Sequence, residues 1–523
     1  MKLVIQLLFG AAFLVWASAT AVLAMRDRAG PVHADFEIAS GVPATLYLPS
    51  EAVPGTSMLP APLPRDERPP AVVLAHGFAG DRIVVSSLAR RLAQNGYAVL
   101  ALDLRGHGAN RNPAPDGRAR PDWLSQDLTA AVEYLRGSPY VDGSRIALMG
   151  HSMGAAAVLD FATRDSGIDG VVAISGAQTL IGPYRPPNVL FLYASADPAA
   201  LQGRATALAG HLAGVDPAED GKTYGDMAHG TAVRLEEVPG TDHLTIIFST
   251  SAASRILHWL DAVFQVDRSA APPSDLSDPR LPPLAGAMAG ALVLLAGVGW
   301  MCGRLAHGLE DRPARGGAAG LAMLAAGLLV AITVLAVGVP AAFLSLDVGD
   351  VMVSLFAVAG GLLLCVGALR SSPIPARELR LALVPGAVGF AGVYLLLTPL
   401  GLVGHRTAPT ALRFFVAAAA AALLLPFFLA FEAALRRGGL MRATLLGVGG
   451  RILVVAVVIL GVRVRVIPSV VMLLVPLLAI LSLLFEVFAA GVYAASGNWL
   501  VIAVTESSWL AWLVATVLPL RAG

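Results

Sequence analysis

Charged residues are scarce in this chain of 523 residues. Only 14% are Asp, Glu, Lys or Arg, whereas 56% are hydrophobic, and the mean hydropathy is +0.70. Soluble chains carry about 25% charged and about 45–50% apolar residues. This scarcity argues against a wholly soluble protein, and the high apolar content excludes a disordered one. We therefore predict that part of the chain lies in a lipid bilayer.

Lysine is missing altogether from Leu281 onward. This part of the chain has 15 arginines and only 8 acidic residues, so its formal net charge is +7. The rest of the chain has a formal net charge of −6. Neither part offers the concentrated basic face that binding of nucleic acid requires. Cysteine is equally rare, since only Cys302 and Cys365 occur, far apart in apolar stretches. We therefore expect no disulfide framework and no cysteine metal site, and the spacing of His, Asp and Glu predicts no other metal and no cofactor.

Residues 1–24 contain an apolar run, residues 3–24, that is followed at once by Arg26 and Arg28. Such a run is long enough to span a hydrocarbon core of roughly 30 Å. It also fits a cleaved signal peptide, because Val22-Leu23-Ala24 places small residues before a possible cut. Signal peptide and signal anchor both remain open, and either sends the following domain, residues 25–269, across the membrane.

Residues 270–283 are rich in proline, serine and aspartate and are predicted to form a linker. Residues 284–523 then form a membrane domain with about eight transmembrane helices. The expected spans lie near 284–303, 318–343, 350–369, 381–403, 412–434, 445–462, 467–490 and 498–519.

The charge of the short loops predicts the orientation of these spans. Three loops on one side of alternating spans hold arginines: Arg304, Arg312 and Arg315; Arg370, Arg377 and Arg380; Arg436, Arg437 and Arg442. An intervening loop holds Asp347 and Asp350 and no base. The arginine-rich side is therefore expected to be cytoplasmic and the domain of residues 25–269 extracytoplasmic, although Arg406, Arg413, Arg463 and Arg465 fall on the opposite side. We expect a multi-pass protein of a bacterial inner or plasma membrane.

Between Ala71 and Leu260, short apolar or β-branched runs alternate with amphipathic stretches, which predicts parallel β–α units. The run 145–150 leads directly into Gly150-His151-Ser152-Met153-Gly154 and an alanine-rich helix. Strand, G-x-S-x-G and helix together are the context of a nucleophile elbow. The turn presents the Ser152 hydroxyl clear of the backbone. The N–H groups of Met153 and of Phe78, on an earlier loop, are predicted to form the oxyanion hole.

Residues 33–265 resemble the α/β-hydrolase superfamily, in particular its dienelactone-hydrolase-like and prolyl-oligopeptidase-like members. The resemblance rests on three motifs: His76-Gly77-Phe78, Asp103-Leu104-Arg105-Gly106-His107-Gly108 and Gly150-His151-Ser152-Met153-Gly154. It implies a mostly parallel sheet with flanking helices. The whole chain is then an α/β-hydrolase fold followed by an all-α membrane domain of no family that we recognise.

The superfamily's order of nucleophile, acid and histidine implies a triad of Ser152, Asp197 and His243. Asp197 follows the predicted strand within residues 189–198, and His243 follows the last predicted strand. Asp242 is the second choice for the acid, and His229 and His211 compete with His243. The other histidines of the motifs (His76, His107 and His151) are expected to shape loops, and Asp103 and Arg105 to brace the loop near the site.

These features predict a serine esterase or acyl hydrolase that acts through an acyl-enzyme on a small or lipid-like ester. A serine peptidase of the same fold is an alternative. So is a transport or lipid-handling membrane protein with a regulatory hydrolase-like domain. The sequence does not indicate an oligomeric state.

Two acids, Glu486 and Glu506, lie inside predicted spans. Ionisable residues within a bilayer are costly and often functional. Glu486 and Glu506 are expected either to form a proton or substrate path or to bind a lipid headgroup, or else to pair with Arg463, Arg465 or hydroxyls such as that of Ser507.

Overall fold

The computed structural model describes residues 2–51, 61–115, 123–178, 182, 184–269, 272–306, 309, 317–338, 343–368, 374–436 and 438–522. The chain divides into two units. Unit 1 comprises Met1–Val22, Pro282–Leu400 and Thr407–Leu518, and unit 2 comprises Leu23–Leu281, Gly401–Arg406 and Pro519–Gly523.

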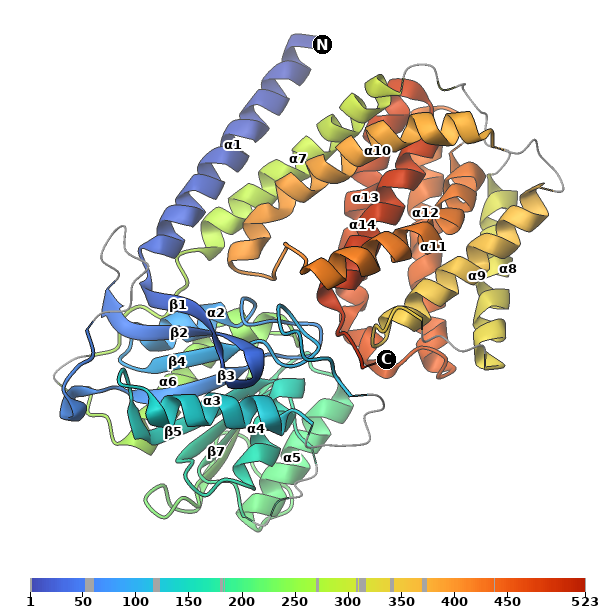
Figure 1. The fold of residues 1–523 in the computed structure, drawn as a ribbon. Coiled ribbons are helices and arrows are strands. Elements are labelled where there is room, and N and C mark those ends of the chain that lie inside the picture. The colour runs from blue at the N-terminus through green and yellow to red at the C-terminus, as the bar shows by residue number, and fades with distance from the viewer. Residues whose placement is uncertain are drawn as a thin grey trace. The chain divides into compact units, whose positions relative to one another are not determined.

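Unit 2 contains a nine-stranded sheet with the order β1-β2-β4-β3-β5-β6-β7-β9-β8 (Figure 1). The strands are β1 (Pro31–Ile38), β2 (Val42–Glu51), β3 (Pro70–Ala75), β4 (Ala98–Leu102), β5 (Asp142–His151), β6 (Gly170–Ile174), β7 (Val189–Ala194), β8 (Thr223–Tyr224) and β9 (Val233–Val238). The six strands from β4 to β9 in this order are parallel, and β1, β2 and β8 pair antiparallel at the two edges. This confirms the predicted mostly parallel sheet.

Helices cover both faces of the sheet because its central strands are apolar on both sides. In β3, Ala71, Val73 and Ala75 pack on one face, and Val72 and Leu74 on the other. Helices α3 (Ser125–Gly137), α4 (Met153–Ala162) and α5 (Ala199–Ala213) cover the first face. Helices α2 (Ser86–Ala93) and α6 (Thr250–Phe264) cover the second.

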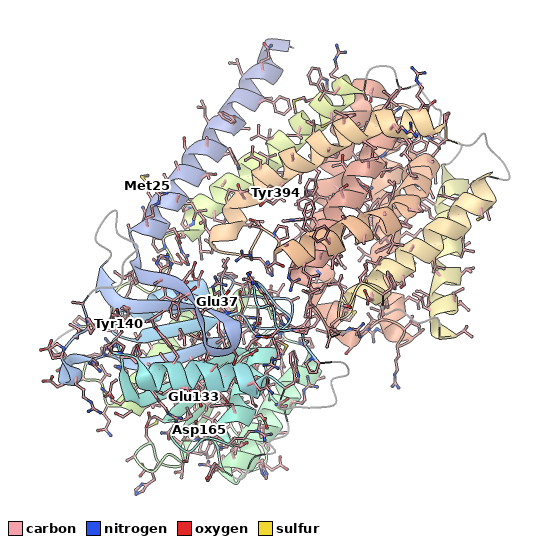
Figure 2. The ribbon with its side chains drawn as sticks, in the orientation of Figure 1. Met25, Glu37, Glu133, Tyr140, Asp165 and Tyr394 are labelled. Atoms are coloured by element: carbon pink, nitrogen blue, oxygen red, sulfur yellow. The ribbon has the colours of Figure 1, made fainter. Side chains whose placement is uncertain are left out.

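Helix α3 shows the amphipathic pattern that places it on the sheet. Its Leu128 and Leu135 are buried in the core, whereas Glu133 on the same helix is exposed and projects outward (Figure 2). The last turn is held by Arg136, which forms an ion pair of 2.7 Å with Asp165. One apolar and one polar side are what a surface helix requires.

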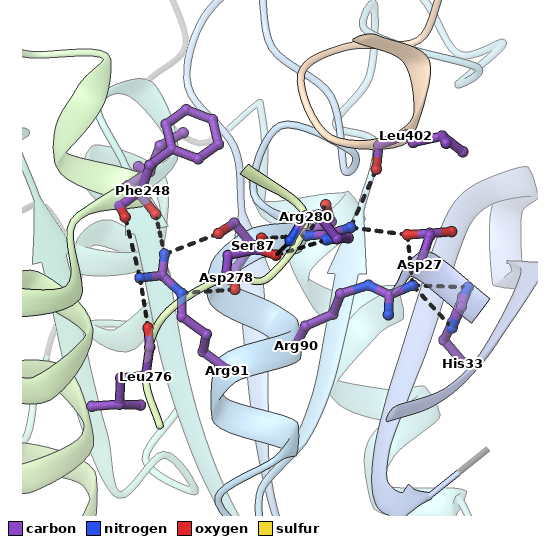
Figure 3. Close-up of polar contacts among 12 residues, drawn as sticks. Asp27, His33, Ser87, Arg90, Arg91, Phe248, Leu276, Asp278, Arg280 and Leu402 are labelled. Atoms are coloured by element: carbon purple, nitrogen blue, oxygen red, sulfur yellow. Dashed lines mark hydrogen bonds and ion pairs between the residues drawn. The ribbon is translucent and has the colours of Figure 1, made fainter. Parts of the chain in front are cut away.

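The linker region of unit 2 is held by a cluster of buried ion pairs (Figure 3). Asp27, near the end of α1 (Lys2–Arg28), lies 2.9 Å from Arg90 and 3.0 Å from Arg280. Asp278 lies 2.8 Å from Arg280, and Arg91 donates to the Ile247 carbonyl oxygen at 2.7 Å. Residues 272–280 form no helix or strand, but Asp278 and Arg280 are buried. Their ion pair lowers the free-energy cost of removing the two charged side chains from water.

Unit 1 consists of helices. These are α7 (Leu281–Leu305), α8 (Ala318–Ala336), α9 (Gly349–Ala368), α10 (Ala376–Leu397), α11 (Ala411–Leu435), α12 (Leu440–Arg463), α13 (Val475–Ser496) and α14 (Leu500–Val517), together with most of α1. Each of the eight predicted spans overlaps one of the helices α7 to α14. Within the described residues, nine helices including α1 are long and apolar enough to cross a bilayer.

Small residues allow the helices of unit 1 to pack closely. A Cβ added at Gly491 of α13 would lie 2.2 Å from the Ala296 carbonyl oxygen of α7, and one at Gly360 of α9 would lie 2.3 Å from the Phe427 nitrogen of α11. Only glycine fits at such distances, which is typical of helix contacts in membranes.

Two arginines counted as loop charges in the sequence are buried, and one of them lies inside a helix. Arg436 directly follows α11, is 1% exposed and forms ion pairs with Glu432 and Glu486. Arg413 is 2% exposed and donates to the carbonyl oxygens of Ala515 and Leu518. The assignment of Arg413 to a loop was therefore wrong, because Arg413 lies in α11, whereas Arg436 lies in the loop after α11 as predicted but is buried in ion pairs. Four other loop arginines lie outside the described residues: Arg312, Arg315, Arg370 and Arg437.

Candidate active site

Ser152 occupies a strained turn between β5 and α4. Its φ of 53° and ψ of −113° lie outside the regions that residues with a side chain favour. The backbone N–H of Ser152 donates to the Ile174 carbonyl oxygen at 2.8 Å, which fixes the turn against the end of β6. Strain of this kind is found at functional sites when the surrounding structure enforces it. Here it leaves the side chain half-buried at the carboxyl end of the sheet.

The flanking glycines allow the turn to pack against the backbone. A Cβ added at Gly150 would lie 2.3 Å from the backbone of Gly154, and one at Gly154 would lie 2.5 Å from the Ala75 carbonyl oxygen at the end of β3. Since carbonyl atoms in the middle of a sheet cannot move aside, the G-x-S-x-G spacing is a packing requirement of this turn.

We predict that Gly154→Ala lowers the free energy of unfolding of unit 2 by about 1–3 kcal/mol, the usual cost of overpacking. The matched control is Gly203→Ala in α5, where an added Cβ meets nothing within 4 Å. Alanine is favoured over glycine by about 1 kcal/mol in a helix, so this control is expected to raise stability slightly. Thermal unfolding of the purified full-length variants measures both changes, and equal effects at the two positions would contradict the packing argument.

The structure brings Ser152, His243 and Asp197 together. The Ser152 Oγ lies 3.0 Å from His243 Nε2, and His243 Nδ1 lies 2.6 Å from Asp197 Oδ1. Asp197 follows β7 and His243 follows β9, so the carboxyl ends of the parallel strands supply all three side chains. Both Asp197 and His243 are 6% exposed. The three predicted triad residues are therefore connected by hydrogen bonds in the required order.

Hydrogen bonds hold Asp197 in the ionised form. Burial raises the pKa of Asp197, but hydrogen bonds from His243, Ser175 and the Ala194 N–H outweigh it and keep this pKa below its ordinary value of 3.8. The Ser175 Oγ donates at 2.6 Å and the Ala194 N–H at 2.9 Å, both to Oδ2. An ionised Asp197 can only accept, so His243 carries its hydrogen on Nδ1 and presents Nε2 as the acceptor for Ser152.

Two residues that the sequence did not place at the triad contact it. Ser175 follows β6 and binds Asp197, and the only sequence signal for it is its position at the end of a parallel strand. His151 was expected only to shape a loop, but its Nε2 lies 2.8 Å from the His243 carbonyl oxygen. Burial and the nearby His243 lower the pKa of His151 to about 3, so it is neutral and donates this bond.

The loop of the first motif lies beside the serine. A Cβ added at Gly77 would lie 3.1 Å from the Ser152 Cβ, which places Phe78 one residue from a direct contact with the turn. His76 Nδ1 donates to the Gly77 carbonyl oxygen at 2.8 Å and its Nε2 accepts from the Leu104 N–H at 3.0 Å, so this ring shapes the loop. Met153 begins α4, and the first amides of a helix have no carbonyl partner within it.

The competing residues lie elsewhere. Asp242 accepts from the N–H groups of Leu244 at 2.8 Å and Thr245 at 2.9 Å, and so caps the next turn. His229 forms an exposed pair with Asp226, and His211 is exposed on α5. The two bracing residues are buried or half-buried in ion pairs: Asp103 with Arg82 at 2.5 Å and Arg105 with Asp127 at 2.9 Å. Among the described residues, no group of three or more His, Cys, Asp or Glu is arranged to hold a metal ion.

Parts of unit 2 are similar to known proteins. The family model described as serine aminopeptidase, S33, matches residues 66–213. An uncharacterized protein of Mycobacterium tuberculosis is 41% identical over 95 residues, which cover 18% of this chain and 32% of the relative. Cutinase 2 of Thermobifida cellulosilytica is 32% identical over 99 residues, covering 18% of this chain and 34% of the relative. This chain thus spans about a third of the curated relatives that it matches.

Among solved structures, an esterase of Pyrobaculum calidifontis is 17% identical with a TM-score of 0.33, covering 51% of this chain and 94% of that one. The family model covers the strands β3 to β7 and the elbow at Ser152. Residues 66–213 of unit 2 are therefore similar to this family, and unit 2 has the predicted α/β-hydrolase fold class, a mostly parallel sheet with helices on both faces.

Proposed function

We propose that this protein is a membrane-bound serine esterase whose catalytic residues are Ser152, His243 and Asp197. The observation that supports this most directly is the continuous chain of hydrogen bonds from the Ser152 Oγ through His243 to Asp197, at 3.0 and 2.6 Å. A serine hydroxyl is a weak nucleophile until an adjacent base accepts its proton. The strained backbone at Ser152 adds a second argument, because a purely binding domain has no use for it.

In the proposed mechanism, the Ser152 Oγ attacks the ester carbonyl carbon while His243 Nε2 takes its proton. The carbonyl oxygen becomes an oxyanion and accepts hydrogen bonds from the N–H groups of Phe78 and Met153. The C–O bond of the ester then breaks, and the departing alcohol takes the proton from His243. Asp197 stabilises the imidazolium throughout.

Water completes the reaction. His243 removes a proton from water, the hydroxide attacks the acyl carbon bound to Ser152, and the Ser152 Oγ leaves with the proton that His243 returns. The products are one carboxylic acid and a free enzyme. Neutral His151 supports these steps by holding the His243 backbone, because it donates to the carbonyl oxygen of His243 and carries no charge that would disfavour the imidazolium.

The substrate is proposed to be a lipid-like or cell-envelope ester on the extracytoplasmic side. Only residues 175–188 separate β6 from β7, which leaves no room for a large helical cap. Unit 2 is linked covalently to helices that are long and apolar enough to cross a bilayer, so its substrates would be met at a membrane. The cutinase relatives are named for an esterase activity, in line with this proposal.

Peptide hydrolysis by the same triad is the alternative, and the name of the matching family model favours it. Esterase and peptidase activity are distinguished with the purified full-length protein. Its rate of hydrolysis is measured on 4-nitrophenyl esters of increasing chain length and on aminoacyl 4-nitroanilides. Faster cleavage of esters supports the proposal, and faster cleavage of anilides replaces it with a peptidase. Cleavage of neither, by a folded protein that also resists fluorophosphonates, rejects both.

A further inference from the structure

Unit 1 contains a cluster of five buried ionisable side chains, here called the ion cluster. Its members are Glu432, Arg436, Arg451, Glu486 and Glu506, and none is more than 7% exposed. They come from α11 and its end, α12, α13 and α14. Glu486 and Glu506 were expected to pair with Arg463 or Arg465, but both of these arginines are exposed. The glutamates pair with Arg436 and Arg451 instead, so the expected arginine partners were wrong.

The three glutamates of the ion cluster are unequally paired. Glu486 is bound by both terminal nitrogens of Arg436, at 2.6 and 2.8 Å, and by Arg451 at 3.0 Å. Glu432 Oε2 accepts from Arg436 Nε at 2.5 Å, and its Oε1 lies 3.6 Å from Arg451 without a hydrogen-bond partner. Glu506 Oε1 contacts Arg451 Nη2, but its Oε2 has no hydrogen-bond partner. Glu506 forms an ion pair with one arginine, whereas Glu432 and Glu486 each form ion pairs with two, so the negative charge of Glu506 is the least compensated.

The charges of the ion cluster do not balance when every group is ionised. Arginine keeps its proton in proteins, so two guanidinium groups face three carboxyl groups. Full ionisation would leave one negative charge among completely buried atoms, at a cost of several kcal/mol. One bound proton removes this charge. It also turns a carboxyl oxygen from an acceptor of hydrogen bonds into a donor.

The largest charge effects on Glu506 come from the other members of the ion cluster. The charged groups that act on it are Arg451 of α12, Glu432 and Arg436 from the α11 segment, and Glu486 of α13. Helix α10 also packs against α14, where its Gly386 carbonyl oxygen accepts from Thr505. Among the described residues, the ion pairs of Glu432, Glu486 and Glu506 involve only Arg436 and Arg451 as cations.

We propose that Glu506 is a proton-binding site of the membrane unit, a property separate from the hydrolase. With the proton bound, the ion cluster is neutral, with Arg436 and Arg451 balanced by Glu432 and Glu486. Without it, Glu506 competes with Glu486 for Arg451. Arg451 also lines an apolar cavity of about 130 Å³, with Phe485 and Leu513 among its other walls. Uptake or release of the proton by Glu506 would therefore change the ion pairs of Arg451, which lies on the wall of this cavity.

The proposal is tested by infrared spectroscopy of the purified full-length protein in lipid nanodiscs. The wild type is expected to show the carbonyl band of a protonated carboxylic acid, shifted to lower frequency in D₂O. Glu506→Gln is expected to lose this band. The amide is nearly isosteric with the protonated acid and equally neutral, so this variant is expected to fold. The matched control is Glu378→Gln in α10, also a buried glutamate of unit 1, which should keep the band.

A wild type without such a band, or Glu506→Gln with the band intact, would overturn the proposal. If Glu506→Gln cannot be purified, Glu506→Asp serves in its place. Its shorter carboxyl group is expected to move the band, and an unmoved band would assign the proton to another residue. Fluorophosphonate labelling of the same samples is expected to be unchanged, so failure of this proposal is distinguishable from failure of the proposed esterase.

Discussion

Ser152→Ala is expected to abolish covalent labelling by a fluorophosphonate probe and to lower the rate of ester hydrolysis by about 10⁶-fold, as loss of the nucleophile does in serine hydrolases. Such probes react with a serine whose proton an adjacent base can accept. Alanine removes the Oγ that lies 3.0 Å from His243 Nε2 and leaves the backbone of the turn unchanged. Gel fluorescence of labelled membranes and a 4-nitrophenyl ester assay measure the two effects.

The matched control is Ser144→Ala, which removes an exposed serine from the same strand, β5. It is expected to label and to hydrolyse esters like the wild type. Labelling that persists in Ser152→Ala would assign the reactive nucleophile to another residue. A wild type that is folded but never labels would reject the esterase and direct attention to unit 1.

Asp197→Asn is expected to lower kcat by about 10⁴-fold with little change in KM. The carboxylate accepts the hydrogen of His243 Nδ1 at 2.6 Å, whereas an amide at this position can donate instead. His243 would then carry its hydrogen on Nε2 and could no longer accept the proton of Ser152. Steady-state kinetics of ester hydrolysis measure the loss.

Asp242→Asn is the control for this substitution, since Asp242 adjoins His243 in the sequence but bonds to the backbone of Leu244 and Thr245. We expect it to keep nearly wild-type kcat. A large loss in Asp242→Asn together with a small one in Asp197→Asn would exchange the roles of the two acids.

The pH dependence of stability gives an independent test of the Asp197 environment. Its folded-state pKa lies below the ordinary 3.8, so its contribution to stability is complete above that value and is lost as the pH falls through the folded pKa. The stability advantage of the wild type over Asp197→Asn, measured by thermal unfolding, should therefore be larger at about pH 7 than at about pH 3. An advantage that grows on acidification would contradict the hydrogen-bond account.

The local signals of unit 2 were sufficient to predict its fold and the order of its candidate site residues. The strand, turn and helix around Ser152 follow from patterns of neighbouring residues. In unit 1, the long apolar runs likewise predicted spans that overlap the helices α7 to α14. The chain order of the α/β-hydrolase superfamily, which the sequence resembles, then implied Asp197 and His243. These predictions needed only short-range patterning and a known chain order.

The contacts that complete the site and the ion cluster join residues far apart in the chain. Ser175 and His151 contact the triad only because β6 and β5 lie side by side with β7 and β9 following in the sheet. The sequence suggested that Arg436 is a loop charge and that Glu506 pairs with Arg463, whereas in the structure Arg436 pairs with Glu486 and Glu506 with Arg451. Distance along the sequence does not reveal which helix faces pack together. The sequence by itself determined the elements and the candidate nucleophile. Only the tertiary structure decided which buried charges balance, because that depends on contacts between whole helices.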